Sequence, residues 1–405
     1  MAKLVLNNAF KDPTFLREKL MLDFLNDHGI TAPRATFAKL YLNGYYWGLY
    51  SVVEDVNKTF LKDRFDNKGG NLFKGDPKGS LQWKGPTESL YYSDYELKTN
   101  ETENDWSDLV RLINALNNTP SAQLADSLDQ YLNVDSWFSY WATHNLFANL
   151  DSYIGSGHNY FLYHNKDTGK FEWITWDVNE AFGNFNQGLS LPNIKTLPIG
   201  YIPNPANARP MMNRLWQDPV FQQRLADRIC SLLPDFNNNQ LDARIDVLAN
   251  LIRPAVQADS LKFYSNALFE QNLSQDANIG QGPGGGTIAG LKPFVTARRN
   301  SLVQQLAVYG CNLSATVDFF DNQAITISPN PFSETITLSF PVEKTQTLKL
   351  NWSNLSGQTI LTETILVTGG LHEWQPNLPG AGMYLLSLSG EFGRVTQKVV
   401  RIGNE

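Results

Sequence analysis

The stretch HNLFANLDSYIGSGHNYFLYHNKDTGKFEWITWDVNEAFG, residues 144–183, decides the fold of this chain. It places Asp151 in a loop after an apolar helical segment, and Asn159 follows at the start of the next element. Two β-rich runs come next, NYFLYHN and KFEWITWDV, and the second run carries Asp177 near its end. The pattern predicts a helix, a loop and a strand pair, with two aspartates 26 residues apart.

Phosphoryl transfer is a chemistry that uses this set of side chains. One carboxylate accepts the proton of the attacking hydroxyl, and a second, often helped by an asparagine, holds the divalent cation that bridges the phosphates. Protein kinases supply these groups in the same order: a catalytic loop, a strand pair, and a metal-binding aspartate. Asp151 and Asp177 are therefore candidates for these two roles. An aspartate in a loop is more often an Asx turn or a helix cap, so both interpretations stay open at this point.

The sequence around this stretch predicts a mixture of helices and strands. Asp12 is placed to cap a helix over residues 12–28, and Asn43-Gly44 predicts a hairpin between strands at 37–42 and 46–54. Further helices are expected over residues 56–65, 105–118, 121–132, 134–148, 211–234, 239–270 and 291–309. A polar, aromatic-rich stretch at 71–98 predicts strands and loops, so the fold class of residues 1–310 is α+β.

After Cys311 the sequence pattern becomes all-β. Short alternating runs follow one another with turn residues between them: TVDFF, AITIS, TITLSF, TLKLNWSNL, QTILTETILV, MYLLSLS and RVTQKVVRI. This spacing is typical of a small Ig-like β-sandwich. We therefore expect a linker at 311–323 and a second domain at 324–405.

Composition excludes several classes of protein. The formal net charge is −7, which argues against a general nucleic-acid scaffold, because phosphate binding needs a clustered positive excess. No run of 18 apolar residues occurs, so no transmembrane segment is expected, and the first residues lack the pattern of a signal peptide. Cys230 and Cys311 are too few to form a zinc site between them but could form one disulfide.

Several motifs of the first domain, taken in order, resemble the CotH kinase family, named for the spore-coat protein H of endospore formers. The stretches that carry the resemblance are LVLNNAFKDPTFLREKLMLDFL, APRATFAKLYLNGYYWGLYSVVEDVNKTFL, GNLFKG, HNYFLYHNKDTGKFEWITWDVNEAFG and PFVTARRNSLVQQL. Together they extend over roughly residues 1–310. Each motif is moderately specific, and their order makes the resemblance strong.

The resemblance implies an atypical protein-kinase-like fold that transfers phosphate from ATP, with Mg²⁺ or Mn²⁺, to Ser or Thr hydroxyls of a protein substrate. It makes Asp151 the catalytic aspartate and Asp177 a metal ligand, with Asn159 or Asn179 assisting the metal. It also suggests two cofactor-binding residues, Glu54 and Lys74. Lys74 could equally be a solvated loop lysine, and Glu54 could brace a hinge or cap a helix.

This sequence departs from the family pattern in two ways. Asn179 stands where the family has a second acidic residue, which reduces the charge available to a cation. The family also has a preceding segment with an Arg-Gly-Asn motif and basic strands, and this sequence begins after it. The resemblance therefore implies an amino-terminally truncated chain that lacks the front of the nucleotide lobe.

The β-rich tail carries a second resemblance. The stretches ISPNPFSETITLSF, LSGQTI, LPGAGMYLLSLS and VTQKVVRI resemble the type A C-terminal sorting domain of type IX secretion, over about residues 324–402. This resemblance implies export across the outer membrane of a Bacteroidetes-type bacterium, with the secretion machinery as a partner. The expected location is secreted or at the cell surface.

Other functions remain open on the sequence alone. A non-catalytic protein that binds a surface or matrix and keeps the kinase fold as a scaffold is the main alternative, and a glycan-directed enzyme is a weaker one. Arg17 could reach the site or form a surface ion pair, and His144 and His158 flank the Asp151 loop. A locally basic stretch could attract phosphates or be a solvated face: Lys62, Arg64, Lys68, Lys74, Lys78 and Lys84.

Overall fold

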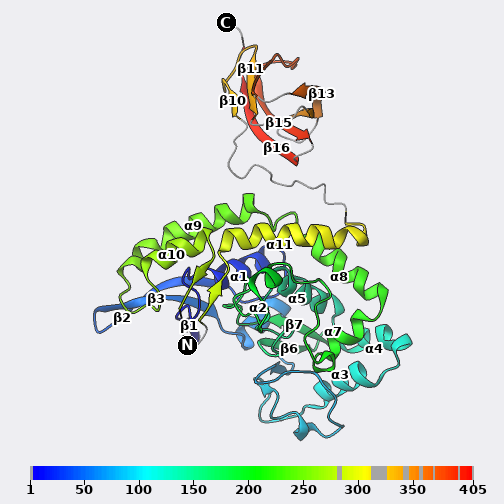
Figure 1. The fold of residues 1–405 in the computed structure, drawn as a ribbon. Coiled ribbons are helices and arrows are strands. Elements are labelled where there is room, and N and C mark those ends of the chain that lie inside the picture. Colours follow the sequence, from blue (N-terminus) through cyan, green and yellow to red (C-terminus); the bar gives the residue numbers. More distant parts are fainter. Residues whose placement is uncertain are drawn as a thin grey trace. The chain divides into compact units, whose positions relative to one another are not determined.

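The computed structural model divides the chain into two compact units, Met1–Cys311 and Asn312–Glu405 (Figure 1). The residues that it describes are 3–280, 285–311, 326–340, 346–354, 359–367, 370–390 and 393–403. The first unit mixes helices with small antiparallel sheets, and the second is β-rich. This agrees with the α+β class expected for the first part and the all-β class expected for the tail.

The first unit holds the elements that position the candidate site. Its helices are α1 (Arg17–Asp27), α2 (Lys58–Phe65), α3 (Ser107–Asn118), α4 (Leu124–Tyr131), α5 (Val134–Leu146), α6 (Leu191–Lys195), α7 (Pro210–Trp216), α8 (Pro219–Leu232), α9 (Asn238–Ala258), α10 (Asn266–Ser274) and α11 (Leu291–Leu306). Its strands are β1 (Leu4–Asn7), β2 (Ala35–Leu42), β3 (Tyr45–Glu54), β4 (Leu72–Lys74), β5 (Glu96–Leu97), β6 (Tyr160–Asn165), β7 (Lys170–Thr175), β8 (Ala277–Asn278) and β9 (Thr287–Ile288).

The hairpin predicted at Asn43-Gly44 is confirmed. Strands β2 and β3 pair antiparallel across this turn, and β1 adds to the other edge of β3, giving the order β1-β3-β2. Asn43 and Gly44 have φ angles of 51° and 83°, the left-handed pair that a type I′ hairpin turn requires. In Figure 1 this sheet runs alongside α9, which contacts β3.

A second antiparallel sheet, in the order β5-β4-β6-β7, packs against α5. Trp137 and Tyr140 of α5 lie against Trp173 of β7, with ring centroids 4.6 and 5.2 Å apart. The same Trp173 ring stacks on Tyr160 of β6 at 4.5 Å. All four rings are buried, so the loop that joins α5 to β6 is anchored at both ends by one aromatic core.

The expected helix over residues 12–28 begins later than predicted, at Arg17. The preceding segment turns, because Ala9, Lys11 and Phe15 have left-handed φ angles of 55°, 59° and 60°. Asp12 is therefore not the residue at the cap position. Its carboxylate still accepts from the backbone N–H of Arg17 at 2.9 Å, so it satisfies one unpaired donor of the helix from five residues away.

Two long predicted helices are each divided in two. The helix expected at 211–234 ends at Trp216, and Pro219 then starts α8 with Asp218 as its cap. The helix expected at 239–270 ends at Ala258. There the carboxylate of Asp259 accepts from the backbone N–H of Leu49 in β3, at 3.0 Å. Because that bond comes from a distant strand, local periodicity could not predict the break.

The second unit is built from the strands β10 (Thr326–Ser328), β11 (Ile336–Phe340), β12 (Gln346–Ser353), β13 (Thr359–Val367), β14 (Gly370–Trp374), β15 (Gly382–Gly390) and β16 (Gly393–Arg401). They form antiparallel sheets in the orders β10-β11-β14 and β13-β12-β15-β16. One buried cluster joins them, including Ile336 of the first sheet and Trp352 and Leu386 of the second. The sequence analysis missed β14, and the strand that it expected at 316–320 lies outside the described residues.

Cys230 in α8 and Cys311 after α11 form a disulfide that closes a segment with a sequence separation of 81 residues. This bond fixes the end of the first unit to α8. Helix α11 also contributes the fully buried Arg298, whose guanidinium donates to the backbone and side-chain oxygens of Asn145 at 3.0 and 2.7 Å. The disulfide-bonded C-terminal part of the unit thus supports the last turn of α5.

Candidate active site

The loop from Phe147 to His158 is shaped by tight backbone contacts that hold Asp151. The backbone N–H of Ser156 donates to the carbonyl of Leu150 at 2.8 Å. A side chain at Gly155 would place its Cβ only 2.0 Å from the same carbonyl oxygen. Gly157 has φ +95°, and a Cβ there would overlap the guanidinium of Arg209. Both glycines are therefore required by this loop geometry.

Asp151 accepts hydrogen bonds at both carboxylate oxygens. Asn159 donates from Nδ2 to the backbone oxygen at 2.8 Å and to Oδ2 at 3.2 Å. Ser156 Oγ donates to Oδ1 at 3.2 Å, and His158 Nε2 lies 3.3 Å from the same oxygen. Asp151 is therefore held as an oriented carboxylate, and its partner is Asn159, which the sequence analysis had assigned to the metal with Asp177.

Asp177 follows β7 and carries the clearest sign of a binding function. Its Oδ1 is buried and has no hydrogen-bond partner among the described residues. Burial, together with the negative charge of Asp151, raises the pKa of Asp177 from 3.8 to about 6, and Lys74 and His158 offset part of this rise. A buried carboxylate oxygen without a partner costs free energy unless a ligand completes it.

Some of the left-handed residues of the described chain lie at or near these two aspartates. Asn159 and Asp177 have left-handed φ angles of 62° and 50°, and so do the nearby Ala148 at 43° and Phe182 at 60°. Each such residue costs about 1–3 kcal/mol and persists only where the surrounding structure enforces it. Strain of this kind is most common at functional sites, so it supports assigning the site to this loop pair.

Lys74 lies at the edge of this site. It ends β4, which pairs with β6, and its charge lowers the pKa of Asp177. Its Nζ is 2.5 Å from Asp76 in the following turn. That turn packs on Tyr160, since a Cβ at Gly75 would meet the Tyr160 ring at 2.3 Å. The structure therefore places Lys74 within electrostatic reach of the site.

Glu54, by contrast, is engaged elsewhere. It forms ion pairs with Arg34 and Arg64, the latter at 3.1 Å. Burial alone would raise its pKa, but the hydrogen bonds and charges of these arginines more than offset that effect and lower it. Both oxygens of its carboxylate are engaged by these two arginines, so the geometry favours the bracing role.

Arg17 forms neither of the contacts expected from the sequence, which were a surface ion pair or a contact with the site around Asp151 and Asp177. Its side chain is fully buried and pairs with Asp12. Its guanidinium also donates to Asn272 Oδ1 at 2.8 Å and to the carbonyl of Ala289 at 2.7 Å. The expectation of a surface ion pair is wrong, because this arginine ties the start of α1 to the C-terminal part of the unit.

His144 has a structural position. It is fully buried, and burial lowers its pKa to about 3, so the ring is neutral. It contacts Asn149, with 3.2 Å between His144 Nδ1 and Asn149 Nδ2.

The basic stretch is largely neutralised in pairs: Lys62 with Asp66, Arg64 with Glu54, Lys74 with Asp76 and Lys84 with Asp94.

Three ionisable residues near the site were given no role in the sequence analysis. Lys11 and Glu180 form an ion pair at 2.9 Å, and Glu180 interacts electrostatically with both Asp151 and Asp177. Glu18 of α1 is buried, and burial raises its pKa to about 8, with Asn7 as its hydrogen-bond donor and Asp177 as a nearby charge. Glu180 stands within the quoted WDVNEAFG motif, and Lys11 and Glu18 stand within the quoted LVLNNAFKDPTFLREKLMLDFL, but the sequence analysis gave none of them a role.

The donor set could hold a divalent cation with the help of further ligands. Asp177 offers a buried, unpartnered Oδ1, and both hydrogen bonds that Asn159 donates use Nδ2, so they leave its Oδ1 uncommitted. Across the described part of the chain, no group of three or more His, Cys, Asp or Glu side chains is arranged to hold a metal alone. Mg²⁺ is commonly held by one or two carboxylates together with substrate phosphates and water, which is what these residues can provide. Asn179 donates its backbone N–H to Asp177, and its side chain is partly exposed.

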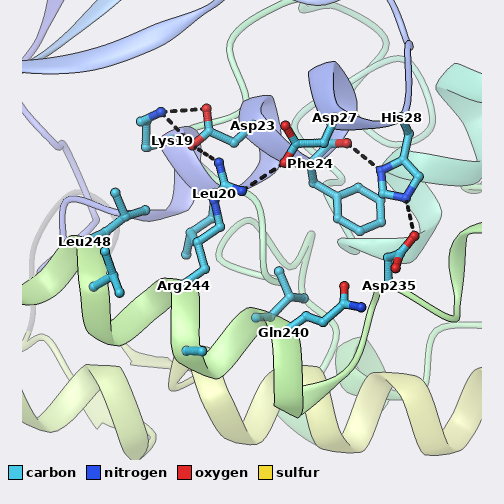
Figure 2. A pocket seen from close by; sticks show the side chains of 13 residues that line it. Lys19, Leu20, Asp23, Phe24, Asp27, His28, Asp235, Gln240, Arg244 and Leu248 are labelled. Atoms are coloured by element: carbon cyan, nitrogen blue, oxygen red, sulfur yellow. Dashed lines mark hydrogen bonds and ion pairs between the residues drawn. The ribbon is translucent and has the colours of Figure 1, made fainter. Parts of the chain in front are cut away.

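A separate cavity of about 690 Å³ lies between α1 and α9 (Figure 2). Its charged groups already pair with one another. Asp23 lies 2.5 Å from Lys19 and 2.8 Å from Arg244, and His28 lies 3.0 Å from Asp235. Asp151, Asn159 and Asp177 do not line this cavity, so it is distinct from the candidate site.

Comparison with known proteins defines the class of this two-unit chain. The family model described as CotH kinase protein matches residues 1–300, and the secretion system C-terminal sorting domain matches residues 326–402. The chain therefore belongs to the CotH kinase protein family and carries a C-terminal sorting domain for secretion.

Relatives in this family come from a bacterium and a fungus. Inner spore coat protein H of Bacillus subtilis is 31% identical over 182 residues, which are 44% of this chain and 49% of that protein. Invasin CotH2 and invasin CotH3 of Rhizopus delemar are each 23% identical, over 337 and 328 residues, covering 75% of this chain and 54% of each relative. The chain spans about half the length of these curated relatives.

The sorting-domain match supports the expected export of this chain. Within the described ranges, none of the helices is both long enough and apolar enough to cross a membrane.

Proposed function

We propose that this secreted CotH-family protein transfers the γ-phosphate of ATP, with Mg²⁺ or Mn²⁺, to Ser or Thr hydroxyls of a protein acceptor on a kinase-like scaffold. The observation that carries the proposal is the buried, unpartnered Oδ1 of Asp177 beside the oriented carboxylate of Asp151. Family membership supports the same chemistry. We further propose that the tail is recognised by a type IX secretion machinery and brings the protein to the cell surface or the medium.

In the proposed mechanism, Asp151 accepts the proton of the attacking hydroxyl. Its hydrogen bonds from Asn159 and Ser156 hold the carboxylate in one orientation, which is what a positioned general base needs. Asp177, with Asn159 and Asn179 as possible additional ligands, would hold the divalent cation, which supplies charge neutralisation for the phosphates when bound. Lys74 adds positive charge on the same side, and Glu54 keeps its bracing role.

The binding half of this proposal is tested by thermal unfolding of the full chain with ATP, with and without Mg²⁺ or Mn²⁺. A ligand that binds only the folded state at 100 times its Kd stabilises that state by about 2.7 kcal/mol. We expect a rise in Tm that requires both ATP and the metal. An equal rise with ATP alone, or none with either metal at millimolar ATP, would contradict a metal-nucleotide site.

A second candidate function is binding to a host or matrix surface without catalysis. The Rhizopus relatives CotH2 and CotH3 are called invasins, which favours it. The absence of any metal-dependent nucleotide effect, together with saturable binding of the secreted chain to cells or matrix, would favour this candidate over the kinase.

A further inference from the structure

Lys11 and Glu180 form an ion pair that is buried unusually well for two charged side chains. The Nζ atom of Lys11 donates to Oε1 and Oε2 of Glu180 at 2.9 and 3.0 Å. The side chains are only 15% and 8% exposed. The two residues are 169 positions apart in the sequence, so the pair exists only because the fold brings the first turn of the unit to the loop after β7.

The backbone at Lys11 is strained and held from several sides. Its φ of 59° lies in the left-handed region, which is uncommon for a long side chain. Asn184 donates to the Lys11 carbonyl at 2.9 Å, and the Nζ atom lies 5.3 Å from the ring centre of Phe185 and 5.6 Å from that of Phe10. The lysine is therefore fixed against residues 180–185, the segment that directly follows the metal-ligand candidates.

Lys11 lies beside three carboxylates and has one N–H donor left for a further acceptor. Glu180 interacts electrostatically with Asp151 and Asp177, so these three carboxylates form one acidic group. A lysine ammonium has three N–H donors, and Glu180 takes two of those of Lys11. For the third donor, the described residues provide no acceptor. Lys74, the other lysine that acts on this group, already lies 2.5 Å from Asp76.

We propose that Lys11 contacts the phosphates of the bound nucleotide and that Glu180 positions it, an inference that rests on the proposed function. The ion pair keeps the ammonium beside the acidic group, and its third donor is available to a phosphate oxygen. Lys11 is thus a binding residue and Glu180 a positioning residue. This assignment gives the chain a phosphate contact within residues 1–310.

The test compares calorimetric titrations of the full chain with Mg-ADP and with adenosine, which lacks phosphates. Lys11→Met should weaken Mg-ADP binding about ten-fold or more, because it removes a charge-assisted hydrogen bond. It should leave adenosine binding unchanged, and Lys11→Arg should retain most of the Mg-ADP affinity. Glu180→Gln, which keeps the lysine but removes its anchor, should give a smaller loss.

A matched control is available in Lys195, which is 14% exposed and pairs with Asp276 at 2.7 Å. Lys195→Met should leave both affinities unchanged. If Lys11→Met binds Mg-ADP as tightly as the wild type, the inference about Lys11 is overturned and the proposed function is not. If Lys11→Met loses adenosine affinity as much as Mg-ADP affinity, Lys11 has a purely structural role and the inference is again overturned. If the wild-type chain binds neither ligand, the proposed function and the inference both fail. Mn²⁺ binding followed by electron paramagnetic resonance separates the metal from the phosphate, and Lys11→Met should not weaken it.

Discussion

Replacing Asp177 with Asn is expected to abolish phosphoryl transfer and, at the same time, to make the protein more stable. Loss of the metal-binding carboxylate should reduce transfer at least about 100-fold, in the range seen when one electrostatic group is removed from a preorganised site. Stability should rise because the Asp177 carboxylate is buried near Asp151 and has an unpartnered Oδ1. Opposite effects on activity and stability distinguish a functional residue from a structural one.

The sign of the stability change follows from the pKa of Asp177. Its pKa in the folded state is raised from 3.8 to about 6, so the folded state binds the proton more tightly than the unfolded state. The charged carboxylate therefore costs stability in full above about pH 6, and this cost disappears as the pH falls toward 4. Because Asp177 as a whole residue is partly exposed although its Oδ1 is buried, we expect Asp177→Asn to gain about 1–2 kcal/mol at pH 8.

The measurement is thermal unfolding without metal at pH 8 and pH 4, alongside a phosphate-incorporation assay. We expect Asp177→Asn to raise Tm by about 2–4 °C at pH 8 and by little at pH 4. Asp129→Asn is a suitable control, since Asp129 is 69% exposed and pairs only with Lys170 in the described chain. A fall in Tm for Asp177→Asn at pH 8 would mean that this aspartate is a structural residue.

Removal of the Cys230–Cys311 disulfide should cause the largest loss of stability in the first unit. A cross-link that closes a loop of about 80 residues reduces the entropy of the unfolded chain, which adds up to about 4 kcal/mol to the free energy of unfolding. Calorimetry of the full chain with and without a thiol reductant should show a lower transition for the first unit. The chain has only these two cysteines, so the transition of the β-rich tail serves as an internal control and should not move.

The Cys230→Ser, Cys311→Ser double variant should reproduce the effect of the reductant. Nucleotide binding should weaken as the variant approaches unfolding, because α11 supports the end of α5 through Arg298 and Asn145. If mass spectrometry shows two free thiols in the reduced wild-type chain and its first transition is unchanged, the disulfide contributes nothing to the fold.

Elements with strong local signals were predictable from the sequence. The Asn43-Gly44 hairpin could be predicted because its turn requires left-handed residues. Helix α5 and the strand pair that follows it could be predicted as well. Asn159 was predicted to assist the metal with Asp177, and its contact with Asp151 was not predicted. What failed depended on distant partners: the late start of α1 at Arg17, and the break at Asp259 through a bond to β3.

For the charged residues around the site too, positions along the chain could be predicted from the sequence, whereas partners across the fold could not. Asp151 and Asp177 are in a recognisable order along the chain, so their roles could be proposed before the geometry was known. Glu54 could be placed at the end of a strand, but its two arginine partners could not be chosen from the sequence. Lys11 stands in one of the quoted motifs, but its role could not be assigned from the sequence, because its partner Glu180 lies across the fold.

The most direct test of the account is phosphate transfer by the full chain, measured with γ-labelled ATP and Mg²⁺ or Mn²⁺. Wild-type protein is compared with Asp151→Asn and with the exposed-site control Asp129→Asn. The account predicts label on Ser or Thr residues of the chain or of an added protein acceptor, reduced at least about 100-fold in Asp151→Asn and unchanged in the control. Equal labelling by Asp151→Asn, or metal-dependent ATP binding without any transfer, would contradict it.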